Sequence, residues 1–290
     1  MAEYNYNELG QLVKKNLHGN SSSRLQGIDY RYNSRGWLTS INNAKLNTDA
    51  NNTLDGAFSE DDAYGEELTY NSNFTAGGTT GSAQWNGNIS GMTWKSKAPS
   101  NAYSSVNVSA YAFQYDKLNR LTLAYYGSGA NVSSWNDNPG RYNEALSYDV
   151  MGNIATLQRT GLNSNVDNLS YTYGSSSNKL LAVTNSSSTP VGFVDGNKSG
   201  NDYAYDENGN LTTDNNKGLA INYNYLNLPS SVSSSSQGKT ITYTYDATGK
   251  KLKKSFPGQA DHYYMDGVEY DGSTLLFAMT EEGRVRPKTG

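Results

Sequence analysis

Two histidines mark the places where acid–base or nucleophilic chemistry could arise in this 290-residue sequence. His18 lies in a Leu-His-Gly-Asn segment, and His262 follows an aspartate ahead of two tyrosines. A nucleophilic triad needs a serine beside one of them and a carboxylate behind it. Serine is so abundant here that such neighbours arise by chance, and we therefore assign no catalytic residue.

Paired carboxylates are a second candidate chemistry, because glycoside hydrolysis needs two acids held about 5–10 Å apart. The acid runs at 60–62 and 281–282 are more simply explained as solvated loop residues. The oxygen-rich stretch 206–210 suggests a calcium loop, but its glycine stands at the fourth position instead of the sixth. The sequence therefore predicts a protein that is not an enzyme and has no metal site and no cofactor.

Composition narrows the classes of partner. The net charge is −4 with a pI near 5.3, whereas a nucleic-acid surface normally needs a basic stripe. The lysines within 250–254 form a basic cluster, which we interpret as a solvated strand edge. Cysteine is absent, so no disulfide or thiolate site is expected, and no apolar run is long enough for a membrane span.

Aromatic residues leave a binding function open. Aromatic faces can stack on sugars or anchor a protein partner, although in a repeated sheet they more often fill the core. Trp135 is the best candidate for binding, because it lies in a Gly/Ser/Asn/Pro-rich segment. The alternative function is therefore a glycan- or protein-binding adhesion module. The other tryptophans are Trp37, Trp85 and Trp94.

A repeated sequence motif, called the phrase below, predicts the secondary-structure elements that would position the candidate catalytic and binding residues. It is a tyrosine, then Asp or Asn, two variable residues, and then Gly or Asn. Such an internal repeat is the strongest guide to architecture. The repeat positions are Tyr6, Gly10, Tyr32, Gly36, Tyr115, Asp116, Asn119, Tyr148, Asp149, Gly152, Tyr205, Asp206, Gly209, Tyr223, Asn227, Tyr245, Asp246 and Gly249.

The turn chemistry of the phrase predicts a β-hairpin. An Asp or Asn side chain bonds to backbone N–H groups ahead of it, and Gly or Asn supplies the left-handed residue that closes a type I turn with a bulge. Tyrosine then ends each incoming strand, and stacked hairpins align these rings on one face. We therefore predict an all-β fold of repeated hairpins in a spiralling sheet.

The predicted organisation has two parts. Residues 1–260 form the repeated sheet, with loop insertions at about 44–66, 128–141 and 185–202, and residues 261–290 form a terminal hairpin segment. Within the long gap between repeats, 68–71 is predicted as a strand end and 84–89 as a tight Asn-Gly hairpin.

The phrase resembles the YD repeat of the rearrangement-hotspot (RHS) family, which includes bacterial polymorphic toxins, the C component of Tc toxins and the teneurin shell. The resemblance rests on the phrases at 205–211 and 115–121, and on 276–287, which is similar to the segment leading into the RHS-associated core. It covers most of the chain, which would be a fragment upstream of that core.

The resemblance implies a non-enzymatic shell segment that encloses or presents a C-terminal effector. The implied partners are the remainder of the same polypeptide, namely the RHS core and the effector, with a surface glycan or protein as a further possibility. Family membership also implies a secreted or bacterial cell-surface location, although no signal peptide begins this sequence. Self-cleavage in the family uses an Asp-Pro phrase that is missing here, so this activity is not carried over.

Overall fold

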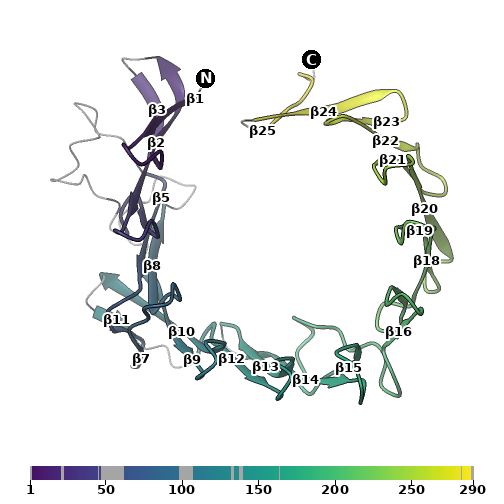
Figure 1. The fold of residues 1–290 in the computed structure, drawn as a ribbon, viewed down its shortest axis with the longest axis horizontal. Coiled ribbons are helices and arrows are strands. Elements are labelled where there is room, and N and C mark those ends of the chain that lie inside the picture. Colours follow the sequence, from purple (N-terminus) through teal and green to yellow (C-terminus); the bar gives the residue numbers. More distant parts are fainter. Residues whose placement is uncertain are drawn as a thin grey trace. The chain divides into compact units, whose positions relative to one another are not determined.

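The computed structural model describes residues 2–20, 23–44, 46, 62–97, 107–131, 134–136, 140–162, 164–281 and 283–288. These residues form β-strands joined by turns and irregular segments, and the described part contains no helix (Figure 1). Consequently no described helix is available to cross a membrane. The all-β prediction is confirmed.

The chain divides into two compact units. The first contains Met1–Tyr148 with Thr156–Asn168, and the second contains Asp149–Ala155 with Leu169–Gly290. Two strands, β13 (Ile154–Thr160) and β14 (Asn165–Tyr173), contribute residues to both units.

The first unit is an antiparallel sheet with the strand order β1-β2-β3-β4-β5-β8-β9-β10-β12, while β11 pairs with β10 and β6 pairs with β7. Its strands are β1 (Ala2–Tyr6), β2 (Leu12–Asn20), β3 (Ser23–Tyr32), β4 (Leu38–Ile41), β5 (Tyr64–Thr69), β6 (Phe74–Ala76), β7 (Thr79–Gly81), β8 (Gly91–Ser96), β9 (Val108–Tyr115), β10 (Leu121–Asn131), β11 (Ser134–Asn136) and β12 (Glu144–Tyr148).

The second unit pairs β14 with β15 and carries a ten-stranded sheet in which β16 to β25 follow sequence order (green to yellow in Figure 1). Its strands after β14 are β15 (Leu180–Asn185), β16 (Tyr203–Tyr205), β17 (Leu211–Asp214), β18 (Leu219–Tyr223), β19 (Pro229–Ser234), β20 (Lys239–Tyr245), β21 (Lys251–Ser255), β22 (His262–Met265), β23 (Val268–Asp271), β24 (Thr274–Thr280) and β25 (Gly283–Val285).

A hydrophobic cluster forms where the β6–β7 hairpin lies on β9. Alternate residues of β9 are buried, and Ala110 and Ala112 pack with Ala76 of β6. Phe74 and Trp135 lie at the margin of this cluster. Small residues are required because the two layers approach closely.

The β6–β7 hairpin corrects one prediction. The tight hairpin expected at 84–89 is wrong, since residues 82–90 contain no strand and lead from β7 into β8. Gly77 and Gly78, with φ of 57° and 81°, form the tight turn instead, because two consecutive left-handed residues match the twist of a hairpin.

The predicted insertions also differ in part from the structure. Residues 128–131 continue β10 and 134–136 form β11, because pairing Gly129 with Trp135 brings the indole to the hydrophobic cluster. In the insertion predicted at about 44–66, residues 45 and 47–61 lie outside the described part, and β5 already begins at Tyr64, near its predicted end. Between β15 and β16 the backbone is irregular, as the composition of 185–202 suggested.

Candidate functional site

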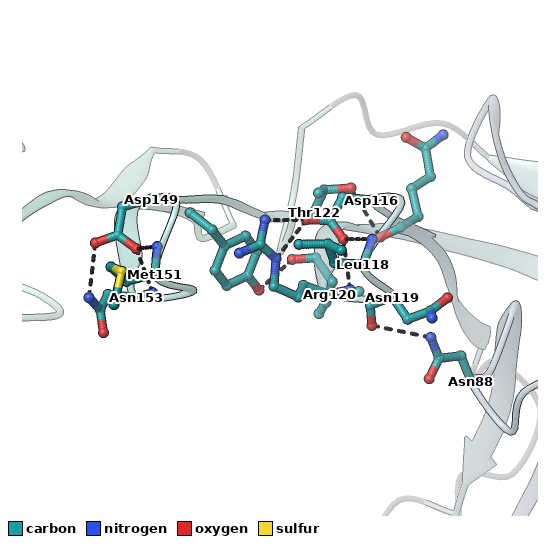
Figure 2. A network of polar contacts seen from close by, with 12 residues as sticks. Asn88, Asp116, Leu118, Asn119, Arg120, Thr122, Asp149, Met151 and Asn153 are labelled. Carbon is teal, nitrogen blue, oxygen red and sulfur yellow. Dashed lines mark hydrogen bonds and ion pairs between the residues drawn. The ribbon is translucent and has the colours of Figure 1, made fainter. Parts of the chain in front are cut away.

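The repeated turn is built around one carboxylate or amide oxygen. In Asp149, Oδ1 accepts hydrogen bonds from the N–H groups of Met151 (2.8 Å) and Asn153 (2.9 Å), as Figure 2 shows. The Gly152 N–H donates to the Asp149 carbonyl at 3.1 Å, which closes the turn. These bonds satisfy the backbone donors of the loop and so fix its path.

The other copies of the phrase repeat this geometry. Their Oδ1 atoms accept from the N–H group four residues ahead, over 2.8–3.1 Å; these residues are Asn7, Asn33, Asp116, Asp206, Asn224 and Asp246. Each closing residue has a positive φ, as the turn chemistry predicts, and these are Gly10, Gly36, Asn119, Gly209, Asn227 and Gly249.

Hydrogen bonding lowers the pKa of the aspartates in these turns. The Asn210 side-chain amide lowers the pKa of Asp206, and the side-chain amide of Asn153 does the same for Asp149. The Thr248 hydroxyl lowers the pKa of Asp246, and the Arg120 N–H that of Asp116. Each bond favours the charged form of its carboxyl group.

The tyrosine links each hairpin to the one before it. Its phenol OH donates to a carbonyl at the start of the preceding return strand, or two residues before that start in the case of Ile89, with donor–acceptor distances of 2.7–3.0 Å. The pairs are Tyr32 to Leu12, Tyr70 to Leu38, Tyr115 to Ile89, Tyr148 to Leu121, Tyr173 to Ile154, Tyr205 to Leu180, Tyr223 to Leu211 and Tyr245 to Pro229.

Two tyrosines show how this bond depends on a neighbouring hairpin. Tyr70 belongs to the series although its own turn is replaced by the β6–β7 insertion, and it is 8% exposed. Tyr6, the first tyrosine, is 60% exposed and donates no such bond to the described residues. Burial raises the pKa of several linked phenols, including Tyr205 and Tyr245.

Neighbouring turns also contact one another within each unit. In the second unit, Asn208 and Asn210 both donate to Oδ1 of Asn227 at 3.0 Å. In the first unit, the Arg120 guanidinium lies 4.5 Å from the centre of the Tyr148 ring. Sequence reasoning predicted the turns but missed the tyrosine links. The available signal was a spacing of six residues between most repeat tyrosines and the residue whose carbonyl accepts the bond of the next tyrosine.

The aromatic side chains of the first unit largely cover one another. Trp94 stacks on Tyr111 with ring centres 5.5 Å apart, and Tyr126 meets the edge of Tyr111 at 5.6 Å. Trp135, the sequence candidate for binding, packs against Phe74. Trp85 is 62% exposed.

The groups considered for catalysis lie apart from this series. His262 Nε2 is 2.7 Å from Glu269 Oε2, and its ring packs against Tyr264. The His18 side chain and residues 60, 61 and 282 lie outside the described part. Within the described part, no group of three or more His, Asp or Glu side chains is arranged to hold a metal ion.

The lysine cluster is not at a strand edge, which corrects another prediction. β21 pairs with β20 on one side and with β22 on the other. Lys253 lies 3.0 Å from Asp261, and the Lys251 ammonium lies over the rings of Tyr243 and Tyr264. The carboxylate that directly precedes β22, and the rings on the adjacent strands β20 and β22, therefore accompany the charges of Lys253 and Lys251.

Comparison with known proteins gives a fold and no family. No protein-family model and no curated protein matches the sequence. A crystal structure of TcdB2-TccC3-Cdc42 matches 92% of this chain with 14% identity and a TM-score of 0.50. A Tc holotoxin pore from Photorhabdus luminescens matches 98% of the chain with 13% identity and a TM-score of 0.47.

This chain spans only 13% and 14%, respectively, of the lengths of those two chains. At such identity the similarity concerns the fold alone. The arrangement of antiparallel strands in this protein thus resembles a segment of TcdB2-TccC3.

Proposed function

We propose that this chain is a non-enzymatic structural segment of an RHS-type, YD-repeat shell, which encloses or presents a C-terminal effector of the same polypeptide. The observation that carries this proposal is the use of the repeated residues. In hairpin after hairpin, the Asx side chain is bonded within its own turn and the tyrosine is bonded to the preceding hairpin. The motif that defines the sequence therefore serves to hold hairpins together.

Two further observations support the proposal. The repeat phrase resembles that of a family which includes the C component of Tc toxins, and the fold resembles a segment of TcdB2-TccC3. A structural role needs extended, self-supporting sheets, and hairpins that bond to their neighbours provide them. The same family implies secretion or exposure on a bacterial surface.

A glycan- or protein-binding adhesion module is the alternative. Sugar stacking requires accessible ring faces, whereas Trp94, Tyr111 and Tyr126 cover one another and Trp135 packs against Phe74. The geometry therefore favours the structural role.

The test uses the complete product of the parent gene. We expect limited proteolysis to leave the segment that follows residue 290 intact under conditions in which the same segment, expressed alone, is digested. A folded protein whose C-terminal segment is cleaved as fast as the isolated segment would contradict enclosure. Saturable binding on a glycan array, lost on substitution of Trp94 or Trp135, would favour the adhesion module.

A further inference from the structure

A small cavity in the first unit lies between the turn after β3 and the segment after β5. Its volume is about 220 Å³, and its wall includes Arg35, Trp37 and Tyr70. Neither the turn geometry nor the tyrosine link requires an open space here. The cavity can hold a group about the size of one sugar ring or one amino acid, well below the usual size of a drug-binding pocket.

Arg35 is held in place by its neighbours. Its guanidinium carbon lies 5.0 Å from the centre of the Trp37 ring, and Nη1 donates a hydrogen bond to the Trp85 carbonyl. Trp37 packs against Tyr70, whose ring centre is 5.2 Å away, and lies beside Gly87. A guanidinium restrained in this way loses little further freedom when it binds an anion.

Arg35 has no carboxylate partner among the described residues, unlike Arg120 and Arg159. Arg120, two positions further along the equivalent turn of another hairpin, has the Asp116 carboxylate 2.7 Å away. In the turn of Arg35 the corresponding residue is Asn33, which carries no charge. None of the carboxylates that the structure describes lies within ion-pair distance of Arg35, whereas Arg120 and Arg159 each have an aspartate partner.

The remaining wall suits a small polar ligand. It presents the short hydroxyl and amide side chains of residues Ser34, Thr39, Asn71 and Ser72 beside the aromatic rings. Hydroxyl groups both donate and accept hydrogen bonds, and a planar guanidinium fork matches a carboxylate. We propose that this cavity binds a carboxylate carried by a ligand of one-ring or one-residue size, with Arg35 as the anion-binding group.

The experiment measures binding to the intact 290-residue chain by the indole N–H signals of its tryptophans in NMR spectra. The Trp37 signal is assigned through Trp37→Phe. D-Glucuronate and N-acetylalanine are titrated separately, each against its uncharged analogue, D-glucose and N-acetylalanine amide. We expect a saturable shift of the Trp37 signal with one or both carboxylates; the ligand that produces it distinguishes a sugar source from a peptide source.

Variants test the role of Arg35. Arg35→Gln should weaken binding by at least about tenfold, since it removes a charge-assisted hydrogen bond. Arg35→Lys, which keeps the charge but loses the fork, should retain weaker binding. Arg284→Gln is the matched control, because Arg284 also lies over an aromatic ring, at 5.3 Å from Phe277, but outside this cavity. It should bind as the unmodified protein does.

The inference is overturned by any of three results. These are no saturable shift with either carboxylate, equal binding of the uncharged analogues, or unchanged affinity in Arg35→Gln. Because Arg35 is exposed, its substitution should leave the fold intact, and an unchanged melting temperature checks this.

Discussion

Two regions of the molecule hold their hairpins together by different means. Between β5 and β11, a second layer covers the sheet; fully buried alanines, together with buried glycines, lie where the layers meet. Between β16 and β21, none of the hydrophobic side chains is fully buried, and Asp214 is the buried residue. The second region relies on turns, cross-strand pairing and tyrosine links.

The difference indicates that the repeat is self-sufficient and that the layered core is a local addition. In β16–β21 each hairpin adds one tyrosine link and one bonded turn, so its stability should grow with the number of neighbours. Around β9, stability should instead depend on close packing, where small changes in volume are costly. Substitutions in the two regions can separate these mechanisms.

The largest effect is expected from Gly81→Ala in the layered region. A Cβ atom on Gly81 would lie 2.0 Å from the Ser90 carbonyl oxygen and 2.7 Å from that of Phe113. Because both neighbours are backbone, the strands must separate, and the free energy of unfolding should fall by about 3 kcal/mol or more. Chemical denaturation measures the loss.

Gly238→Ala is the control for this substitution. It lies in the β19–β20 turn with φ +60°, and nothing would contact its Cβ atom within 4 Å. Its cost is therefore limited to backbone strain, on the order of 1 kcal/mol. Equal losses in the two variants would mean that the β6–β7 layer is not closely packed.

The next effect concerns the tyrosine link in the regular region. Tyr223→Ala should lower the free energy of unfolding by about 2–3 kcal/mol, below the range for a fully buried ring because Tyr223 is half-buried. Tyr223→Phe, which removes only the bond to the Leu211 carbonyl, should cost about 1 kcal/mol. Thermal and chemical melts give both values.

Tyr6 provides the matched control for the link. It occupies the same position in its phrase but is 60% exposed. Tyr6→Ala should change stability by less than about 0.5 kcal/mol, as surface substitutions usually do. A loss as large as that of Tyr223→Ala would show that the tyrosine acts within its own hairpin.

A smaller difference should separate two residues of one turn. Gly209 has φ +87°, so Gly209→Val places a β-branched residue in the left-handed region and should cost on the order of 1–3 kcal/mol. Glu207→Val, two residues earlier in the same turn, should be nearly neutral. Similar melting temperatures for both variants would contradict the role of Gly209 in closing the turn.

The smallest effect is a dependence on pH. The folded pKa values of Asp206 and Asp246 lie below the ordinary value of 3.8, so their stabilising contribution is present above pH 3.8 and is lost as the pH falls toward the folded pKa. Replacing both by Asn should flatten this acid dependence in melts between pH 2 and 7, roughly the span over which exposed carboxyls titrate. The natural Asn224 turn shows that the amide is compatible with the geometry. An unchanged pH profile would contradict this assignment.

The sequence alone determined the all-β fold class and the geometry of the repeated turns. Each repeat places its tyrosine, its Asx residue and its closing Gly or Asn within five consecutive residues. The backbone conformations that these residue types favour therefore act locally, and they can be predicted without knowledge of the tertiary structure. Thus Gly209 and Asn227 both have the positive φ that the phrase predicts. The predicted ends of the insertions were less accurate, because residues 128–131 and 134–136 pair through contacts that composition does not encode.

Tertiary structure decided which hairpins meet and what their side chains then contact. Tyr223 bonds to Leu211 only because two hairpins lie side by side, and Tyr70 joins the series although an insertion hides its phrase. Likewise, Gly77 and Gly78 form the turn of a hairpin that covers the sheet, and Asn33 supplies no carboxylate to Arg35 beside a cavity. These outcomes depend on residues distant in sequence, whose approach is governed by packing and not by local preference.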